Sequence, residues 1–496
     1  MTDTFLQAIT YLFTIESLSY LALGTVIGLL FGAIPGLGGT TALALLIPMT
    51  FGMQPDAAIV LVGGIMGGVP FGGSLSAILL NTPGIAPNAA TCFDGYPLAR
   101  KGKAGIAIGA AATASALGGL IGVGVMLAVI PVAKAIVLLF GPPEFFMLGV
   151  LGLSAIAVST GGKLIRGLIS GGFGLILAFV GFDEVGGGLR YTAGIEYLWD
   201  GVPLVPVLIG LFAISEMINL MAVGGQVSTG TGSASVGKVF EGVQAVFNNL
   251  ATLIRGSSIG AFIGAVPGIG GTVASFLSYT VTRQISKKPE SFGKGNIQGV
   301  IASEAANNAK DGGSLIPTLA FGIPGSAEMA VFLGVLVLHG FEPGPRLLLD
   351  HENVIYGLVM ALALSCLFAS AIGLCLSRYL VLLTRTDVHY LAPIVLSIAL
   401  IGAYALQSSF GDVIVAMIFG VIGYFMVRFD YPRITLVIAL VLGGIVERSY
   451  HQSLMMSGGS HSIFFTRLVT DILLVLIVIS LALPVFRILF SGRRKG

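Results

Sequence analysis

Charged residues are scarce in this chain of 496 residues: they make up 10% of it, whereas a soluble domain carries about 25%. A surface that stays dispersed in water needs far more charge than this. The chain also has only 3 cysteines, too few for a disulfide framework or a cysteine-based metal motif. These shortages exclude a soluble enzyme, a nucleic-acid-binding protein, a disordered protein and a disulfide-rich scaffold.

Apolar residues and glycine are what the chain has in excess. Hydrophobic residues make up 55% of it, the mean hydropathy is +0.98, and the 72 glycines follow no triplet period of the collagen type. This composition predicts a glycine-rich polytopic membrane protein. No Lys or Arg precedes Arg100, so a cleaved secretory signal with a basic start is not expected, and the first apolar segment should remain as a membrane helix.

Apolar runs long enough to cross about 30 Å of hydrocarbon recur along the chain. Uninterrupted candidates are 105–130, 142–160, 164–181, 203–222, 353–377, 390–405, 412–427, 433–447 and 466–490. Four further segments are apolar but interrupted by Gly and Pro: 16–52, 56–84, 251–282 and 313–340. Inside lipid, a broken backbone survives only where protein or a water-filled cavity surrounds it, so the interruptions are candidate functional positions.

Basic residues give an orientation. Most Lys and Arg fall in the loops 94–103, 160–166, 223–250, 283–312, 378–389 and 428–433 and in the C-terminal tail, whereas the loops near 183–200 and 342–352 are acidic. Cytoplasmic loops carry the excess of Lys and Arg. The C-terminus is therefore expected in the cytoplasm and the N-terminus outside.

An internal repeat is visible at one of the interruptions. The run Gly32–Thr40 (GAIPGLGGT) recurs as Gly264–Thr272 (GAVPGIGGT), and the two differ only by aliphatic exchanges. Further downstream, Gly72–Leu75 matches Gly312–Leu315, and Asn81–Gly84 matches Gly322–Gly325 with one residue inserted between the two matches. Collinear matches of this kind indicate an internal duplication.

The loop charges predict that the two halves are inverted, because one repeat ends at a basic loop and the other at an acidic loop. Paired broken helices in inverted repeats are typical of secondary transporters, whose substrate binds near the midplane. We therefore predict an all-α polytopic membrane protein with about 10–14 transmembrane or re-entrant helices in two inverted repeats with broken helices. The predicted divisions are a first repeat at 1–222, a cytoplasmic linker at 223–250, a second repeat at 251–490 and a basic cytoplasmic tail at 491–496.

The duplicated Pro-Gly-x-Gly-Gly-Thr element suits anion binding. Proline ends a helix, glycine permits unusual backbone angles, and the Thr is expected to cap a new helix. A helix N-terminus that faces a cavity offers free N–H groups and a partial positive charge to a carboxylate. Such a site would hold its ligand with helix N-termini and Ser, Thr and Asn rather than with an arginine fork. The alternative is that Gly and Pro only allow close helix packing.

A polar run in the second repeat is a candidate for the coupling ion. Glu304, Asn307 and Asn308 are spaced to share one helical turn beside Ser303, and the first repeat has no charged or amide group at the stretch we match to it, Leu61–Phe71. An intramembrane carboxylate with amide neighbours suits a proton or a cation. The alternative is a solvated cytoplasmic loop. Isolated acids at Glu216, Glu328, Asp412 and Asp471 are further residues to test.

Motifs of ATP hydrolysis and zinc proteolysis do not occur in the sequence, and the five histidines lack zinc spacing. We therefore predict that the chain is not an enzyme, has no cofactor and no metal centre, and takes its energy from an ion gradient, with Na⁺ or H⁺ as the coupling ion.

Several of these motifs in combination resemble the large membrane subunit of the tripartite tricarboxylate transporters, and the resemblance covers essentially the whole chain. The runs that carry it are Gly32–Thr40, Leu80–Gly84, Asp94–Gly102, Glu304–Ala309 and Gly322–Ser326. The run Gly63–Pro70 lacks a Tyr that the resemblance leads us to expect, so we do not infer citrate as the substrate.

The resemblance implies a transporter of three parts in the bacterial inner membrane. A periplasmic substrate-binding protein captures a small organic carboxylate, a small membrane subunit accompanies the large one, and the large subunit forms the path across the lipid bilayer. The candidate substrate- and ion-binding residues are Pro35, Gly36, Gly38, Gly39, Thr40, Thr41, Gly73, Ser74, Asn81, Thr82, Pro83, Gly84, Pro267, Gly268, Gly270, Gly271, Thr272, Ser303, Glu304, Asn307, Asn308, Gly313, Ser314, Pro324, Gly325 and Ser326. The alternatives are a stand-alone carboxylate exchanger or channel that needs no receptor, and an intramembrane enzyme or assembly scaffold.

Overall fold

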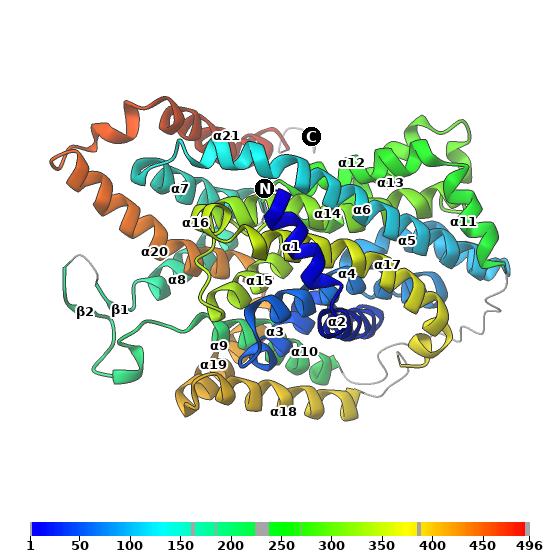
Figure 1. Ribbon diagram of the computed structural model, residues 1–496, viewed down its shortest axis with the longest axis horizontal. Helices are drawn as coiled ribbons and strands as arrows, with labels where there is room; N and C mark the ends of the chain where they lie inside the picture. The colour runs from blue at the N-terminus through cyan, green and yellow to red at the C-terminus, as the bar shows by residue number, and fades with distance from the viewer. Residues whose placement is uncertain are drawn as a thin grey trace.

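A computed structural model describes residues 2–159, 164–183, 186–223, 238–267, 269–383 and 388–491. Almost all of them are helical (Figure 1). The first ten helices are α1 (Thr2–Leu12), α2 (Ile15–Ala33), α3 (Gly38–Thr50), α4 (Pro55–Leu80), α5 (Ala89–Arg100), α6 (Ala104–Val137), α7 (Pro142–Ser159), α8 (Leu164–Ala178), α9 (Leu204–Leu208) and α10 (Ser215–Val223). The others are α11 (Val239–Phe247), α12 (Leu250–Gly264), α13 (Gly270–Ile285), α14 (Ile297–Phe321), α15 (Ala327–Leu338), α16 (Pro345–Asp350), α17 (Glu352–Leu383), α18 (Val388–Gln407), α19 (Phe410–Arg428), α20 (Arg433–Met456) and α21 (Leu468–Ser491).

Eight helical stretches within the described ranges are long and apolar enough to cross a membrane, and five more apolar helices are shorter. The all-α polytopic prediction is confirmed, and the uninterrupted runs predicted as spans are mostly helical, although 164–181 extends past the end of α8 as far as β1. A π-helical turn, Ile209–Ile214, joins α9 to α10. Short 3₁₀ turns occur at Ala86–Asn88, Glu196–Leu198, Pro289–Ser291 and His461–Phe465.

Two sets of helices repeat one element order. In the first, α2 and α3 flank a short break, α4 follows, and α4 ends at Asn81 in the left-handed conformation (φ 57°). In the second, α12 and α13 flank a break, α14 follows, and α14 ends at Gly322 in the same conformation (φ 70°). We call α2–α5 the first unit and α12–α15 the second unit.

Glycines bring the same backbones together in both units. A Cβ at Gly24, Gly28 or Gly32 of α2 would meet the carbonyl oxygen of Leu61, Ile65 or Val69 of α4 at 2.2–2.3 Å. In the second unit, Gly256, Gly260 and Gly264 of α12 lie in the same way against Ala302, Ala306 and Lys310 of α14. These contacts set the structural register: Val69 corresponds to Lys310, and Gly72 to Gly313. The register inferred from the sequence, which paired Gly72 with Gly312, is therefore wrong by one residue, and no insertion is needed to reach Gly84 and Gly325.

In two of the four segments predicted to be interrupted, the chain leaves the helix only at the later motif, Asn81–Gly84 in 56–84 and Gly322–Gly325 in 313–340. Within 56–84, α4 runs unbroken to Leu80 despite Pro70, and the chain leaves the helix only afterwards. In the second unit, α14 begins at Ile297, so residues 297–312 belong to a buried helix and not to a cytoplasmic loop. The glycine-rich runs around Ser74 and Ser314 are therefore helical interior, where they permit close packing rather than a break.

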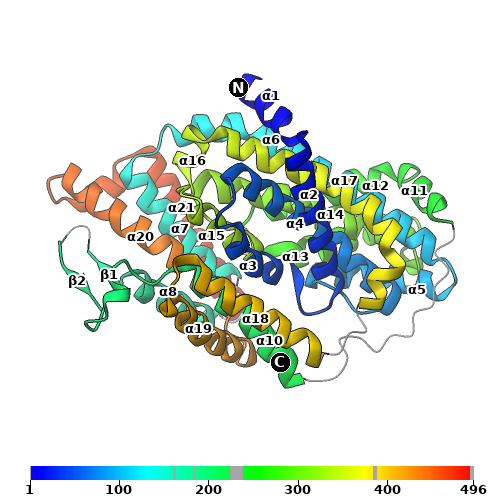
Figure 2. The same cartoon turned by 60° about the horizontal axis from the view of Figure 1, so that its bottom comes forward.

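The central helices of the two units, α4 and α14, lie in the interior of the molecule. The most apolar stretch of α4 is entirely buried, and α14 is buried along most of its length. Figures 1 and 2 both show these two helices inside the bundle. The long helices α6 and α17, of 34 and 32 residues, pack against both of them.

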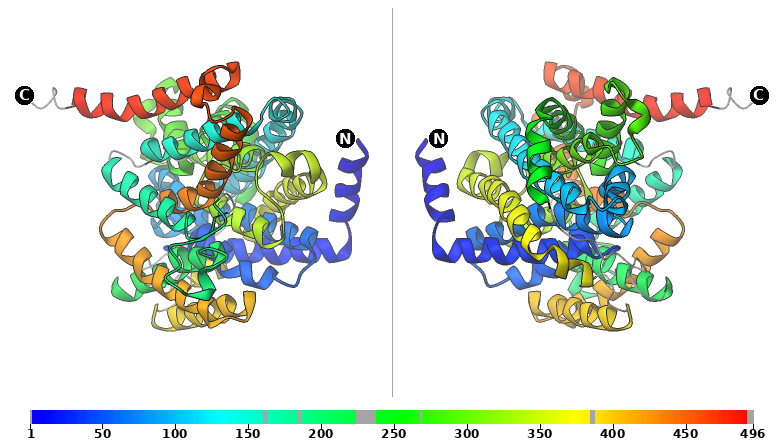
Figure 3. Two further views of the ribbon diagram at one scale, coloured as in Figure 1. Left: turned by 90° about the vertical axis from the view of Figure 1, so that its left-hand side faces the viewer. Right: turned by 90° about the vertical axis from the view of Figure 1, so that its right-hand side faces the viewer.

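Several other elements lie at the periphery of the molecule. A short hairpin of β1 (Gly181–Phe182) and β2 (Leu189–Arg190) projects at one end, with Gly181 opposite Arg190, and α20 extends beside it (Figure 1). Arg190 of the hairpin donates to both carboxylate oxygens of Glu447 on α20, at 2.6 and 3.0 Å. Helices α1 and α21 project from opposite sides of the bundle (Figure 3).

Candidate functional site

The two helix breaks meet at one cavity of about 520 Å³. Residues from both breaks line it, together with the connection that follows α4, the start of α15, the π-helical turn and the start of α20. Its polar and charged lining comes from Thr40, Thr41, Glu216, Thr272, Lys310, Ser326, Glu328 and Arg433. We call this the break cavity. The break cavity gathers predicted site residues from distant parts of the chain, and their role in binding stays a prediction.

Three helices begin at the break cavity. Helix α3 begins at Gly38, α13 at Gly270 and α15 at Ala327, and all three residues line the cavity. Gly38 and Gly270 have φ values of 61° and 75°, which a residue with a side chain rarely adopts. Their first turns direct unsatisfied N–H groups and a partial positive charge at the cavity, as anion sites do.

The predicted capping role of the two threonines is wrong. Thr40 and Thr272 lie in the first turns of α3 and α13, while the cap positions are occupied by Leu37 and Ile269 without a side-chain hydrogen bond. Because the hydroxyls are not used as caps, they are left to line the cavity. The cap of α15 is Ser326, whose Oγ accepts from the Met329 N–H at 3.3 Å.

A buried lysine links the two breaks. Lys310 Nζ lies 2.5 Å from Asp311 Oδ1 and 3.1 Å from Glu328 Oε2. The stem of Lys310 packs against Gly271 in the second break, and the Glu328 carboxylate packs against Gly39 in the first, both so closely that a Cβ would collide. The ion pair of Lys310 and Glu328 therefore spans the space between the two helix N-termini.

A second cation enters from the start of α20. Arg433 Nη1 donates to Leu211 O at 2.9 Å, to Ser215 Oγ at 2.8 Å and to Glu216 Oε2 at 3.3 Å. The neighbouring carbonyl, of Phe212, accepts from Thr41 Oγ1 at 3.1 Å. The widened π-helical turn thus presents two carbonyls to side chains of the cavity, a use typical of π-bulges at functional sites.

The structure separates the predicted site residues into groups. The break cavity gathers Gly36, Gly38, Gly39, Thr40, Thr41, Pro83, Gly84, Gly270, Gly271, Thr272 and Ser326. It is not lined by Pro35, Gly73, Asn81, Thr82, Pro267, Gly313, Ser314, Pro324 and Gly325, which shape the backbone around it. Asn81 is an exposed residue that ends α4, and Gly268 lies outside the described residues.

Glu304 forms a separate polar centre on α14. Its carboxylate is fully buried and accepts from Ser74 Oγ at 2.5 Å, Ser115 Oγ at 3.0 Å and Asn88 Nδ2 at 3.4 Å. Thr91 also donates to it, and Ser303 contacts Thr91 at 3.1 Å. The donors come from α4, α5, α6 and the 3₁₀ turn before α5, so Glu304 holds several elements together. The solvated-loop alternative is wrong.

Buried amide oxygens accompany this carboxylate. Asn307 and Asn308 are at most 3% exposed. Within the described part of the chain, the Oδ1 atoms of Asn88, Asn307 and Asn308 have no hydrogen-bond partner, and neither has the Nδ2 of Asn307. Buried polar atoms are normally satisfied. Oxygens left over beside a buried carboxylate suit a hard cation, which takes oxygen ligands, or a carboxyl group that gains and loses a proton.

Sequence reasoning missed the basic residues of the break cavity. Arg433 was assigned to the edge of the loop 428–433, and Lys310 was not among the predicted site residues. The available signal was Lys310 beside Asp311 in an otherwise apolar helix, and the lone acids Glu216 and Glu328. The expectation that the ligand is held without basic side chains is therefore not supported by the cavity that the breaks form.

The chain is similar to known proteins in sequence. A 52.8 kDa protein of Agrobacterium vitis, named only for its place in the TAR-I ttuC′ 3′ region, is 32% identical over 95% of this chain and 93% of its own length. A second A. vitis protein, from the TAR-II ttuC′ 3′ region, is 32% identical over 42% of this chain and 86% of its own length. No solved structure matches.

Residues 18–438 match the model of a family of transporter components, which are not enzymes. The chain belongs to the tripartite tricarboxylate transporter TctA family.

Proposed function

We propose that this chain is the large permease subunit of a secondary transporter that imports a small organic di- or tricarboxylate into the bacterial cytoplasm. In this proposal it works with a small membrane subunit and a periplasmic substrate-binding protein, and the two units cross the membrane in opposite senses. The observation that carries the proposal is the break cavity, where three helix N-termini and two cations converge on one space.

The chemistry of the break cavity suits a substrate that must be bound and then released. The first turns of α3, α13 and α15 offer N–H groups to carboxylate oxygens. Lys310 and Arg433 each already have an acidic partner, so an incoming carboxylate competes with Glu328 and Glu216. This competition keeps binding weak enough for release, which transport requires.

Ion coupling is assigned in this proposal to Glu304. Glu304 is linked to the break cavity through α14, because Lys310, which lines the cavity, lies less than two turns after Glu304 on this helix. A cation or proton at Glu304 would reorganise the contacts of α14 with α4, α5 and α6, and so influence the break cavity through Lys310.

Vesicle uptake tests the proposal. The chain is reconstituted with its small subunit, a panel of ¹⁴C-labelled di- and tricarboxylates is supplied with the receptor, and a Na⁺ or H⁺ gradient is imposed. We expect receptor-dependent accumulation driven by one gradient. Full uptake without the receptor favours the stand-alone exchanger, and the absence of uptake for every carboxylate contradicts the substrate class.

Matched variants test the two sites separately. Arg433→Gln should raise the substrate concentration for half-maximal uptake about tenfold or more, since a charge-assisted contact is lost. Arg428→Gln, in the same segment but bonded to Tyr424, is the control and should leave uptake unchanged. Glu304→Gln keeps the shape of the side chain and should abolish the dependence on the ion gradient; an unchanged ion and pH dependence would make Glu304 a structural residue only.

A further inference from the structure

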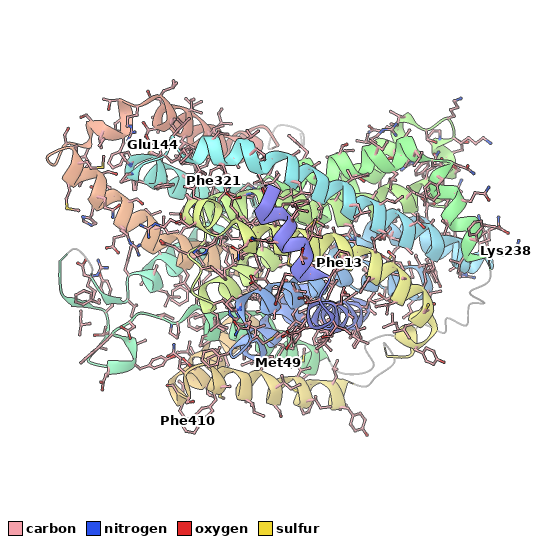
Figure 4. All side chains as sticks on the ribbon, in the orientation of Figure 1. Phe13, Met49, Glu144, Lys238, Phe321 and Phe410 are labelled. Atoms are coloured by element: carbon pink, nitrogen blue, oxygen red, sulfur yellow. The ribbon has the colours of Figure 1, made fainter. Side chains whose placement is uncertain are left out.

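A second cavity, of about 580 Å³, is lined by the α11–α12 junction, the start of α12, the end of α13 and the α13–α14 connection. These elements lie at one end of the molecule (Figure 1). This cavity shares no residue with the break cavity. Its lining contains Arg255, Lys287 and Lys288 and no acidic residue. Figure 4 shows Lys238, just before α11, at this edge of the molecule. We call this the basic cavity.

Two helices begin at the basic cavity. The first turn of α12 contributes Leu250, Ala251 and Thr252, and the first turn of α14 contributes Ile297 and Gln298. Both helix N-termini add partial positive charge to that of the basic side chains. The rim is fixed by Gln298 Nε2, which donates to Asn249 Oδ1 at 2.7 Å, and by Asn296 Nδ2, which donates to Ser291 Oγ at 2.8 Å.

Polar groups at the basic cavity are left without partners. Thr282 is 2% exposed, and its Oγ1 makes no hydrogen bond within the described residues. Arg255 is half-buried, and the described ranges contain no ion pair or hydrogen bond to its guanidinium group. A buried hydroxyl and an uncompensated guanidinium beside two helix N-termini form a built site for a phosphate group.

Apolar surface continues directly from the basic cavity. Leu250 and Ile285 line it and are 45% and 55% exposed, and Ile254, Phe262 and Leu277 continue the exposed apolar surface along α12 and α13. The short helix α11 exposes Phe240 and Phe247 and is amphipathic, which is typical of a helix that lies in the membrane interface. The cavity therefore opens where a lipid headgroup and its acyl chains meet.

We propose that the basic cavity binds the phosphate headgroup of an anionic phospholipid, whose acyl chains pack on the exposed apolar faces of α12 and α13. Basic pockets between membrane helices on the cytoplasmic side recognise such headgroups. Lys101, from the connection after α5, also reaches the α13–α14 connection, where its Nζ donates to Lys294 O at 2.5 Å. A free phosphate ion would use the same cations and helix N-termini but would leave the apolar strip without a partner. The inference does not depend on which substrate is transported.

Lipid binding to the full-length protein tests the proposal. The detergent-purified protein is titrated with phosphatidylglycerol, with phosphatidylcholine and with inorganic phosphate, and binding is followed by native mass spectrometry and by the thermal unfolding midpoint. We expect phosphatidylglycerol to bind and to raise the midpoint well above the effect of phosphatidylcholine. Stabilisation by inorganic phosphate equal to that by phosphatidylglycerol would overturn the lipid assignment in favour of a free anion.

Variants locate the binding. Arg255→Gln combined with Lys287→Gln and Lys288→Gln should weaken phosphatidylglycerol binding at least about tenfold, since each cation near the surface contributes to headgroup attraction. Lys238→Gln is the control, because Lys238 lies at the same end but pairs with Glu241 outside the cavity. If this control loses as much phosphatidylglycerol binding as the triple variant, the lipid is attracted by general surface charge, and the proposed headgroup site in the basic cavity is overturned.

Thr282→Val keeps the proposal testable if the triple variant does not fold. The change removes an unpartnered buried hydroxyl, so the lipid-free protein should be at least as stable as before. Its stabilisation by phosphatidylglycerol should fall. Undiminished stabilisation by the lipid in this variant would contradict the placement of the headgroup at Thr282.

Discussion

The first and second units share a backbone arrangement but differ in the chemistry of their central helices. Glycines of α2 and α12 place α4 and α14 at the same close distance, and both helices end in the left-handed conformation. In the register set by these contacts, Val69 of α4 corresponds to Lys310 of α14, and Gly63 to Glu304. One unit is apolar where the other carries its buried charges.

This difference shows which part of the duplicated element is free to change. The glycine-lined face is fixed by backbone contact, because any side chain there collides. The opposite face tolerates either small residues, as where Gly63 and Gly67 of α4 pack on Ala361 and Ser365 of α17, or polar ones, as on α14. A scaffold kept by small residues in both copies can thus acquire a binding role in one of them.

The largest effect is expected from making the second unit resemble the first at its buried lysine. Lys310→Val leaves Asp311 and Glu328 without their cation, and breaking a buried ion pair costs about 3–5 kcal/mol. We expect the unfolding midpoint to drop sharply and uptake to cease, as measured by thermal unfolding and vesicle uptake.

A neutralised variant is the control for this prediction. Lys310→Val with Asp311→Asn and Glu328→Gln should recover much of the stability without recovering uptake, because the buried charges are gone but the cation facing the break cavity is still missing. Normal uptake by the neutralised variant would show that the two units do not differ in function at this position.

Glycine contacts should respond alike in the two units. A Cβ at Gly32 would lie 2.2 Å from Val69 O, and one at Gly264 would lie 2.3 Å from Lys310 O. Gly32→Ala and Gly264→Ala should each destabilise the protein by about 1–3 kcal/mol through overpacking. Gly124→Ala in α6, where a Cβ meets nothing within 4 Å, is the control. Clearly unequal losses at Gly32 and Gly264 would argue against a shared scaffold.

Loss of one hydrogen-bond donor to Glu304 should have a smaller effect on transport. Only the second unit can show it, because the first unit has Gly63 at the position of Glu304. Ser115→Ala removes the 3.0 Å hydrogen bond to the Glu304 carboxylate and should change the ion concentration for half-maximal uptake about fivefold. Thr113→Val in the same helix is the control, since Thr113 bonds only to Gly109 O of its own helix among the described residues. If both variants shift the ion dependence equally, the hydrogen bonds to Glu304 have no specific role in ion coupling.

The helix ends should show the smallest effect. Gly322→Ala places a side chain at φ 70° and should cost about 1 kcal/mol, whereas Asn81→Gly at φ 57° should be nearly neutral, because Asn already tolerates this conformation. Thermal unfolding of both variants measures the difference. A large loss of stability for Asn81→Gly would assign its side chain a contact that the capping role does not explain.

Sequence patterns predicted the membrane class, the spans and both Pro-Gly-x-Gly-Gly-Thr breaks because these depend on local composition and backbone chemistry. They failed where tertiary packing decides. The glycines near Ser74 lie in a segment that the sequence marks as interrupted, but the carbonyl of Leu29 packs on Gly72, so glycine serves helix contact there. Charge suggested a loop for 297–312, whereas Glu304 and Lys310 are buried because partners from distant segments satisfy them.

Helix α6 has a consequence for the surrounding lipid. Its 34 residues form a rod about 51 Å long, well beyond the roughly 30 Å of hydrocarbon in a typical bilayer. Such a helix either tilts or reaches past the hydrocarbon, and it packs against both α4 and α14. Bilayer thickness should therefore act on both units at once, so that the acyl-chain length of the host membrane becomes a mechanical input to transport.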